Sequence, residues 1–594
     1  MDATLDLSDG FEAPDHQAWV DLVQQALKGA SFDRLIDHTY DGIPVLPLYT
    51  AGDVAGALPA PPRLPYDAFL PWDIRQTVLN PDPRAANKIA LHDLSRGVSS
   101  IEFCIDSAGA CGVAASTPAD FATLTQGIIT EYATVALSGA CVADAAHALQ
   151  SAMALSARAH ARLAFNLDPF LGQMTGQAAV SMDDALDFAK DARTSLPHAT
   201  CLRADARPVH EAGGSEGAEL AYAIGAGIAF LQAGERHGLS PNEVNQTLLF
   251  TLSTGPDVVL EIAKIKAARH LWAHVMAACG AAQAPMRLQA VTSGRMQTRV
   301  DPATNMLRAT CANFAAGAAG ADIITVLPFN SAYALADEKA RRIARNTQLI
   351  LQEETHLGRV RDPAAGAWAM EALAGQMAGV AWAKVQEMER AGGLRAALDQ
   401  GLVQGWVASV AAARLDDVAR GKTGLIGVTR FPNLDEDLPQ WPVHTGAVSQ
   451  KPANPLPPIR LSQDFEALRA LPPKSIFLAT LGTLAGFGPR VGFARNVFES
   501  GGIKALGGVI AFAGVAAIVD AYVASGADLA CICGTDADYA LVASGLARAL
   551  KAKGCKLVFV AGKNQFEGVD RYIFRGCDLV AELKAAHASG AQTL

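Results

Sequence analysis

The chain is 594 residues long, half of its residues are apolar and 18% are charged. This length exceeds what one hydrophobic core supports, so we expect at least two domains, and the composition excludes extensive disorder. The net charge of −10, with no dense basic cluster, argues against binding to nucleic acid or to an anionic membrane.

The N-terminus, MDATLDLSDGFEAPDH, is acidic and lacks the basic and apolar parts of a signal peptide. The longest uncharged apolar stretch, residues 505–519, is glycine-rich and shorter than the roughly 20 residues that a membrane-spanning helix needs. Most of the ten cysteines stand in apolar runs, which is typical of buried thiols rather than of a disulfide framework. We therefore expect a cytoplasmic protein.

Residues 1–67 form the first predicted unit. The segment HQAWVDLVQQAL has a helical pattern, and it is followed by YDGIPVLPLYT and the proline-rich piece LPAPPRLP. The unit has too little apolar material for a core of its own, so we expect an N-terminal arm.

From residue 68 to 430, short strand-like runs alternate with long helical ones. The candidate strands are SSIEFCID, ARLAFNLD, TCLRADARPV, LLFTLST, MRLQAVTSG and DIITVLPF. Such alternation implies parallel strands with helical crossovers. About 360 residues of it fit an (α/β)₈ barrel of the TIM type better than an open sheet.

Residues 431–473 are predicted to be a linker, because nine of the 30 prolines fall in this stretch and proline interrupts both helices and sheets. Residues 474–594 alternate again, with SIFLATL, GVIAFA, LACICG and KLVFVAG as candidate strands. Their short loops predict a flavodoxin-like, doubly wound domain.

The loop after the first of these strands, GTLAGFGPRVG, is where a doubly wound domain binds its ligand. It lacks the dinucleotide fingerprint, because Val491 stands where the third glycine belongs, and the phosphate-loop pattern is also absent. Pro489 fits the first position of the following helix. We interpret the segment as a plain turn.

Three other patterns have better structural than functional explanations. His270 and His274 would share a helix face, but a metalloprotease pattern is missing. Ser215 in GGSEG matches a nucleophile elbow, yet an acidic helical segment follows it, which favours a helix cap. Cys531 and Cys533 have no second ligand pair. We predict no catalytic, cofactor-binding or metal-binding residue in this chain.

Several longer stretches of the sequence resemble those of a known protein family. They are DGIPVLPLYT in the arm, PWDIRQ at the entrance to the barrel, HEAGGSEGAELAYAIGAGIAFL, EIAKIKAARHLWA and RIARNTQLILQEETHLGRVRDPAAGAWAMEAL. With the order of the domains, these strings resemble the methylmalonyl-CoA mutase family over essentially the whole chain. The resemblance implies a TIM-type barrel followed by a cobalamin-binding-type domain.

In that family the terminal domain holds adenosylcobalamin through the pattern DxHxxG, whose histidine ligates cobalt. The same alignment here places Leu484 at the aspartate, Gly486 at the histidine and Pro489 at the glycine. A shift by one residue brings Phe487 to the ligand position, and His587 is the only histidine of the domain. The resemblance therefore implies that this chain does not hold the cofactor.

The barrel departs from the family pattern as well. Thr77 replaces a tyrosine after PWxIRQ, and in QAVTSG, which stands for HTQTAG, Gln289 replaces the histidine and Val291 the glutamine. LPFNSA stands where active chains carry HTNS. Each change removes a polar group that would position a radical or a thioester, so we expect an inactive site.

The apolar patterns of the helices are intact, whereas the polar residues of the family's site are replaced. This combination resembles the small, non-catalytic chains of the heterodimeric bacterial enzymes. The resemblance then implies a large catalytic subunit as partner, which holds adenosylcobalamin and interconverts methylmalonyl-CoA and succinyl-CoA. Two alternatives stay open: an active acyl-CoA mutase with atypical ligands, which would be red with cobalamin, and a regulatory acyl-CoA-binding protein, which would bind succinyl-CoA in calorimetry.

Overall fold

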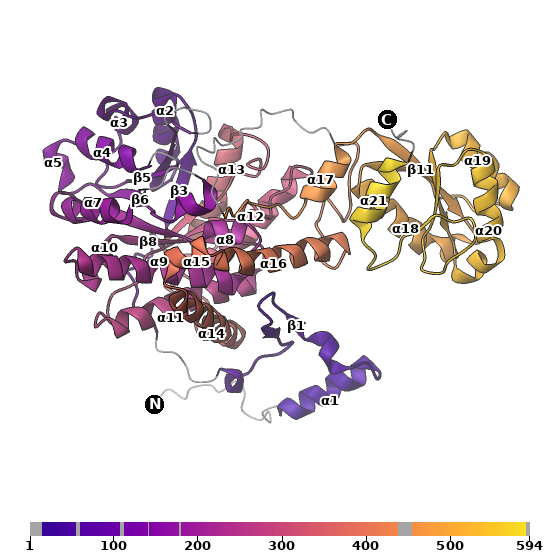
Figure 1. The fold of residues 1–594 in the computed structure, drawn as a ribbon, viewed down its shortest axis with the longest axis horizontal. Coiled ribbons are helices and arrows are strands. Elements are labelled where there is room, and N and C mark those ends of the chain that lie inside the picture. The colour runs from indigo at the N-terminus through magenta and orange to yellow at the C-terminus, as the bar shows by residue number, and fades with distance from the viewer. Residues whose placement is uncertain are drawn as a thin grey trace, which may run out of the picture.

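A computed structural model describes residues 15–54, 60–106, 112–139, 142–176, 180–436 and 454–589. The acidic N-terminal stretch, the start of LPAPPRLP and residues 437–453 of the proline-rich stretch lie outside these ranges. Figure 1 shows the N-terminal arm below a barrel and the C-terminal domain to the right of the barrel. No helix in the described ranges is long and apolar enough to cross a membrane.

The arm holds helix α1 (His16–Leu27), which coincides with the predicted helical segment and has no buried residue. A short hairpin of β1 (Asp37–His38) and β2 (Pro44–Val45) follows it. The carboxylate of Asp41 in this hairpin accepts hydrogen bonds from the Ser215 hydroxyl at 2.7 Å and the Gly217 amide at 2.8 Å. The hairpin is therefore anchored to the barrel, whereas α1 is not.

Eight parallel strands of the described ranges close into a barrel in the order β10-β3-β4-β5-β6-β7-β8-β9, which confirms the TIM-type prediction. The six predicted strands are present, and β3 and β5 are two that we did not predict. The strands are β3 (Asp73–Val78), β4 (Ser100–Ile105), β5 (Thr134–Gly139), β6 (Leu163–Leu167), β7 (Thr200–Asp205), β8 (Leu248–Thr254), β9 (Leu288–Thr292) and β10 (Ile323–Thr325).

Helices surround the barrel (Figure 1). Their bounds are α2 (Pro83–Leu94), α3 (Pro118–Thr125), α4 (Val142–Ala152), α5 (Leu155–Arg158), α6 (Leu171–Thr175), α7 (Met182–Ser195), α8 (Arg207–Glu211), α9 (Glu216–Arg236), α10 (Pro241–Thr247), α11 (Val258–Ala278), α12 (Pro302–Ala318), α13 (Glu338–Leu349), α14 (Trp368–Arg390), α15 (Leu394–Asp399) and α16 (Leu402–Ala419). Helix α9 is buried along most of its length because α11 and α14 pack against it from outside the barrel. At Gly227 a Cβ atom would lie 2.5 Å from the Trp272 ring, so this close packing requires glycine.

The C-terminal domain is a parallel sheet in the order β12-β11-β13-β14-β15, which is the flavodoxin-like arrangement. The strands are β11 (Lys474–Thr480), β12 (Ile503–Gly507), β13 (Leu529–Cys533), β14 (Leu557–Val560) and β15 (Arg571–Tyr572). The helices are α17 (Gln463–Arg469), α18 (Leu484–Ser500), α19 (Val515–Ser525), α20 (Asp536–Ala552) and α21 (Leu579–Ala588). Helix α17 lies within the proline-rich stretch.

Two local predictions in this domain are wrong. We expected a strand at GVIAFA, but the strand is the segment just before it, β12. Val509 and Ile510 of GVIAFA are exposed in the loop that follows β12. Pro489 is not the first residue of its helix, because α18 begins at Leu484. The buried Phe487 belongs to the core of the domain and draws the preceding residues into the first helical turn.

Candidate functional site

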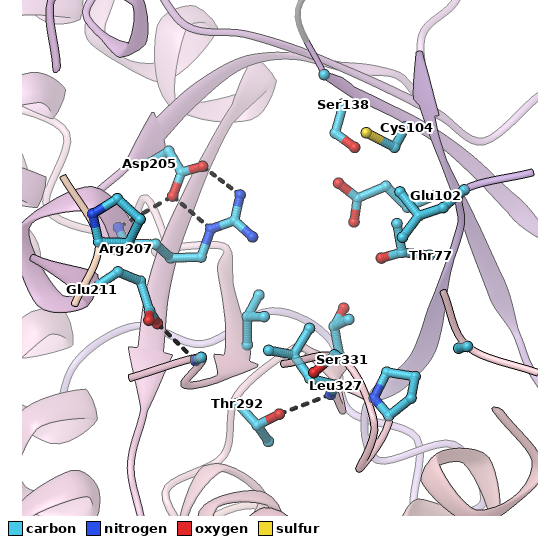
Figure 2. Close-up of a pocket in the computed structure, with 18 of the residues that line it drawn as sticks. Thr77, Glu102, Cys104, Ser138, Asp205, Arg207, Glu211, Thr292, Leu327 and Ser331 are labelled. Atoms are coloured by element: carbon cyan, nitrogen blue, oxygen red, sulfur yellow. Dashed lines mark hydrogen bonds and ion pairs between the residues drawn. The ribbon is translucent and has the colours of Figure 1, made fainter. Parts of the chain in front are cut away.

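A cavity of about 660 Å³ opens at the carboxyl ends of the barrel strands, where TIM-type barrels place their ligands. Figure 2 shows Thr77, Glu102, Cys104 and Ser138 on one wall, facing a second wall that carries Asp205, Arg207 and Glu211. The loop after β10 completes the cavity with residues that include Leu327 and Ser331.

Arg207, the first residue of α8, projects between the two walls (Figure 2). Its Nε and Nη2 atoms donate to the two carboxylate oxygens of Asp205 at 2.8 and 2.6 Å. Burial raises the pKa of Asp205, but Arg203 and Arg207 outweigh burial and bring this pKa down to about 2. The aspartate is therefore ionised and holds Arg207 in a fixed bidentate geometry.

Glu102 on β4 faces Arg207 from the opposite wall and is 3% exposed. Its carboxylate lies 3.6 Å from Nη1 of Arg203, a buried residue of β7. Burial raises the pKa of Glu102, but Arg203 and then Arg75 outweigh it, so the net shift is downward. The cavity thus presents a buried, ionised carboxylate opposite a guanidinium.

Below the cavity, polar side chains fill the barrel axis. Arg75 donates from Nε to the Ser100 hydroxyl at 2.7 Å and from Nη1 to Gln289 at 3.5 Å. Gln289 donates to Thr325 at 3.1 Å, and Arg203 donates to a threonine of β8. Bulky aliphatic residues usually fill this layer, whereas here one set of hydrogen bonds joins β3, β4, β9 and β10 and another joins β7 and β8. A ligand can therefore enter only from the carboxyl end.

Residues 454–461, which we call the strap, cross this end of the barrel. Their backbone amides donate to three rim segments: Leu456 to the carbonyl of Met174 at 2.9 Å, Ile459 to Glu211 at 2.8 Å and Leu461 to Arg295 at 3.1 Å. Leu456 and Pro458 line the cavity. The chain that leads to the C-terminal domain is therefore part of the cavity wall.

The positions singled out in the barrel sequence meet at this site. Thr77, Val291 and the LPFNSA loop line the cavity, while Gln289 lies deeper, in the axis network. We did not predict the charged pair of Glu102 and Arg207. A signal exists in the alternation Arg203-x-Asp205-x-Arg207, because charges at every second residue of a strand point to one face.

The C-terminal loop does not fit a cobalt ligand. Only residues 481–483 separate β11 from α18, so Gly486 falls in the first helical turn. Leu484 is 64% exposed, and Phe487 is buried. The His587 imidazole contacts the Gly501 carbonyl oxygen at 2.8 Å, at the amino edge of the sheet and thus opposite this loop.

The remaining motifs have local explanations. Ser215 caps α9, as predicted, by accepting a hydrogen bond from the Ala218 amide at 3.3 Å. His274 packs edge-on against a tryptophan of α14, and burial lowers the pKa of His270. Cys531 and Cys533 are buried in β13. Within the described ranges, no cluster of three metal-ligating side chains occurs.

Comparisons with known proteins cover nearly all of the chain. A family model described as methylmalonyl-CoA mutase matches residues 38–471. The chain is 36% identical to a methylmalonyl-CoA mutase small subunit of Streptomyces virginiae, over 98% of both chains. It is 30% identical to the small subunit from Propionibacterium freudenreichii subsp. shermanii, over 98% of this chain and 96% of the relative. The chain is 27% identical to the mitochondrial methylmalonyl-CoA mutase of Bos taurus, over 76% of this chain and 66% of the relative.

Proposed function

Because this chain belongs to the methylmalonyl-CoA mutase family, we propose that it is a small subunit that supports a catalytic large subunit and does not catalyse the reaction itself. The large subunit would interconvert methylmalonyl-CoA and succinyl-CoA. Curated relatives along the whole chain are named small subunits, which implies a partner subunit.

The observation that carries this proposal is the first turn of α18. The resemblance assigns the cobalt ligand to a histidine, and the chain has Gly486 there, inside a regular helix. A glycine offers no donor atom, and the neighbouring Leu484 cannot orient an imidazole as a carboxylate would. Bound adenosylcobalamin supplies radical chemistry, and in this proposal the partner binds it.

The barrel gives independent support. Thr77 brings a short side chain to the cavity wall where the resemblance expects a tyrosine. Val291 brings an aliphatic side chain where it expects a glutamine, so two groups that would position the substrate are missing. Losing one such group costs roughly 2–4 kcal/mol of transition-state stabilisation, and losing several leaves no useful turnover.

In this proposal the chain divides into an arm (1–67), a barrel (68–430), a linker (431–473) and a cobalamin-binding-like domain (474–594), and it works in the cytoplasm. The chain would stabilise its partner through a large interface, as subunits of obligate pairs do.

Co-expression with a large subunit that carries an intact DxHxxG tests the pairing. We expect one complex of both chains in size-exclusion chromatography, with mutase activity after addition of adenosylcobalamin. A chain that elutes as a monomer beside its partner would refute the proposal.

Cobalamin binding tests the inactive site separately. After incubation with adenosylcobalamin and desalting, we expect this chain alone to be colourless, whereas the complex should be red. The change Gly486→His in the complex is a useful second sample, because it restores an imidazole without the aspartate. A red, active chain in the absence of a partner would favour the alternative of a working mutase with atypical ligands.

A further inference from the structure

Two oppositely charged side chains, Arg207 and Glu102, face each other across the barrel cavity, and Arg207 has a donor atom available for a ligand. The Nε and Nη2 atoms of Arg207 donate hydrogen bonds to Asp205, but its Nη1 atom forms no hydrogen bond with the described residues. The Glu102 carboxylate points toward Arg207 across the gap (Figure 2). Each group also has another partner: Arg207 is paired with Asp205, and Glu102 lies 3.6 Å from Arg203, which reaches it from β7.

These pairings fix both groups before any ligand arrives. Asp205 holds Arg207 at two points, and Arg203 holds both Glu102 and Asp205, at 3.6 and 3.3 Å. When charged groups are already oriented in the free protein, ligand binding loses little free energy to ordering them. The cavity is thus preorganised for a ligand that carries both charges.

Aliphatic side chains line part of the remaining wall. Val142, Leu171, Val291, Leu327, Leu335 and Leu456 contribute apolar surface around the charged pair. We propose that this cavity binds an aliphatic amino acid, whose carboxylate contacts Arg207, whose ammonium contacts Glu102 and whose side chain packs on these residues.

The charges discriminate against other ligands. A ligand with only a carboxylate could pair with Arg207, but it would also meet the carboxylates of Glu102, Asp205 and Glu211, which line the same cavity. An amine without a carboxylate could pair with Glu102, but it would leave Nη1 of Arg207 without a hydrogen-bonding partner among the described residues. A zwitterion can pair with Arg207 and with Glu102 at the same time, and repulsion between like charges adds to its specificity.

The filled axis limits the size of the ligand. Below the cavity, the Arg75 network closes the barrel, and above it the strap residues Leu456 and Pro458 cover part of the mouth. A compact amino acid fits between these limits.

Calorimetry on the full-length wild-type chain tests this inference with three matched probes. They are leucine, 4-methylpentanoate, which lacks the ammonium, and 3-methylbutylamine, which lacks the carboxylate. We expect saturable binding of leucine at one site per chain, with an affinity at least about tenfold above that of either analogue, because each analogue loses one charge-assisted contact. Absence of saturable leucine binding, equal affinity for an analogue, or displacement of leucine by succinyl-CoA with higher affinity would overturn the inference.

Variants locate the site. Glu102→Gln and Arg207→Gln should each weaken leucine binding by about tenfold or more, and Arg207→Gln should also abolish the preference for leucine over the amine. Leu335→Trp fills the cavity without touching the charged pair, so it should abolish binding and leave the melting temperature unchanged. Arg420→Gln on the far end of α16 is the control. Wild-type binding by a folded Leu335→Trp chain would place the ligand elsewhere and refute the proposed site.

Discussion

The imidazole of His210 is enclosed between two hydrogen-bonding partners. Its Nδ1 atom lies 3.2 Å from a Glu219 carboxylate oxygen, and its Nε2 atom lies 2.9 Å from the Ser293 hydroxyl. This order of groups is that of a hydrolytic triad, but Ser293 is 1% exposed and does not line the cavity. Glu219 also pairs with Lys264 at 2.8 Å, so the group joins α8, α9, α11 and the loop after β9. Its role is structural.

Protonation of His210 should make stability depend on pH. Burial, together with nearby Arg295 and Lys264, lowers its pKa well below 6.5, so the folded chain keeps it neutral. The unfolded chain binds a proton below about pH 6.5, so this contribution to stability is lost as the pH falls below that value, at about 1.4 kcal/mol per pH unit. Urea unfolding at pH 7.5 and 5.5 measures the loss.

His210→Gln keeps two hydrogen-bonding atoms and cannot bind a proton. It should therefore lose less stability than the wild type between pH 7.5 and 5.5. The exposed His198→Gln serves as a matched control and should behave like the wild type. An equal loss in wild type and His210→Gln would show that this imidazole does not titrate on unfolding.

At the scale of the elements, Arg414 connects α16 to the start of α9. Its guanidinium donates to the carbonyls of Gly213 at 3.1 Å and Gly214 at 3.2 Å, and to the buried Glu216 carboxylate at 3.1 Å. It also lies 4.2 Å from the centre of the Tyr40 ring in the arm hairpin. One side chain thus joins three segments that are far apart in the sequence.

Arg414→Met should destabilise the chain by about 3 kcal/mol or more, because Glu216 would be left as an uncompensated buried charge. Arg420→Met, at the end of the same helix, removes an exposed ion pair with Asp416 and a long hydrogen bond of 3.4 Å to the Gly576 carbonyl, and it should cost less than about 1 kcal/mol. Equilibrium denaturation measures both values. Similar costs for the two variants would show that Arg414 does not stabilise the junction.

One strand was easy to predict from sequence because its residues are mostly apolar on both faces. The run LLFTLST is β8, whereas β3 was missed because Arg75 and Gln76 interrupt its apolar pattern. These residues are buried in a barrel whose interior is polar, which a single strand does not reveal. Strand β12 was misplaced because it lies at the edge of its sheet and carries the exposed Lys504, while the loop after it is more apolar.

The residues of the candidate site, like the strands, were predicted only in part from the sequence. Comparison with the family pattern identified Thr77 and Val291, and both line the cavity. Glu102 and Arg207 come from β4 and the start of α8, separated by about a hundred residues in the sequence. They face each other only because eight strands close into a barrel, so their pairing depends on tertiary structure.

At the scale of the whole molecule, the C-terminal domain is attached through a shared core as well as through the chain. Val418, Leu425 and Val428, which follow the barrel, pack in one cluster with Phe465 and Leu468 of α17 and with the core of the domain. The strap ties the same connection to the barrel rim. These contacts restrict the orientation of the domain.

Arg469, at the end of α17, is a polar link in this junction. It donates to the carbonyls of Gly427 at 3.3 Å and Val428 at 3.0 Å, and to Ser500 at the end of α18 at 3.0 Å. Arg469→Ala removes these bonds and leaves buried carbonyls without their donor. We expect a larger radius of gyration in small-angle X-ray scattering and faster amide exchange in residues 425–430.

Arg495→Ala provides the matched control for this prediction. Arg495 also donates to backbone carbonyls, those of Ala505 and Gly507, but both lie within the C-terminal domain. Its loss should destabilise the domain without changing the radius of gyration of the folded chain. If Arg469→Ala gives the scattering and exchange of the wild type, the apolar cluster and the hydrogen bonds of Asn496 to Thr429 and Phe431 fix the domain without Arg469. Because the hydrogen bonds of Arg495 stay within the domain, a difference between the two variants isolates the contribution of the arginine of α17.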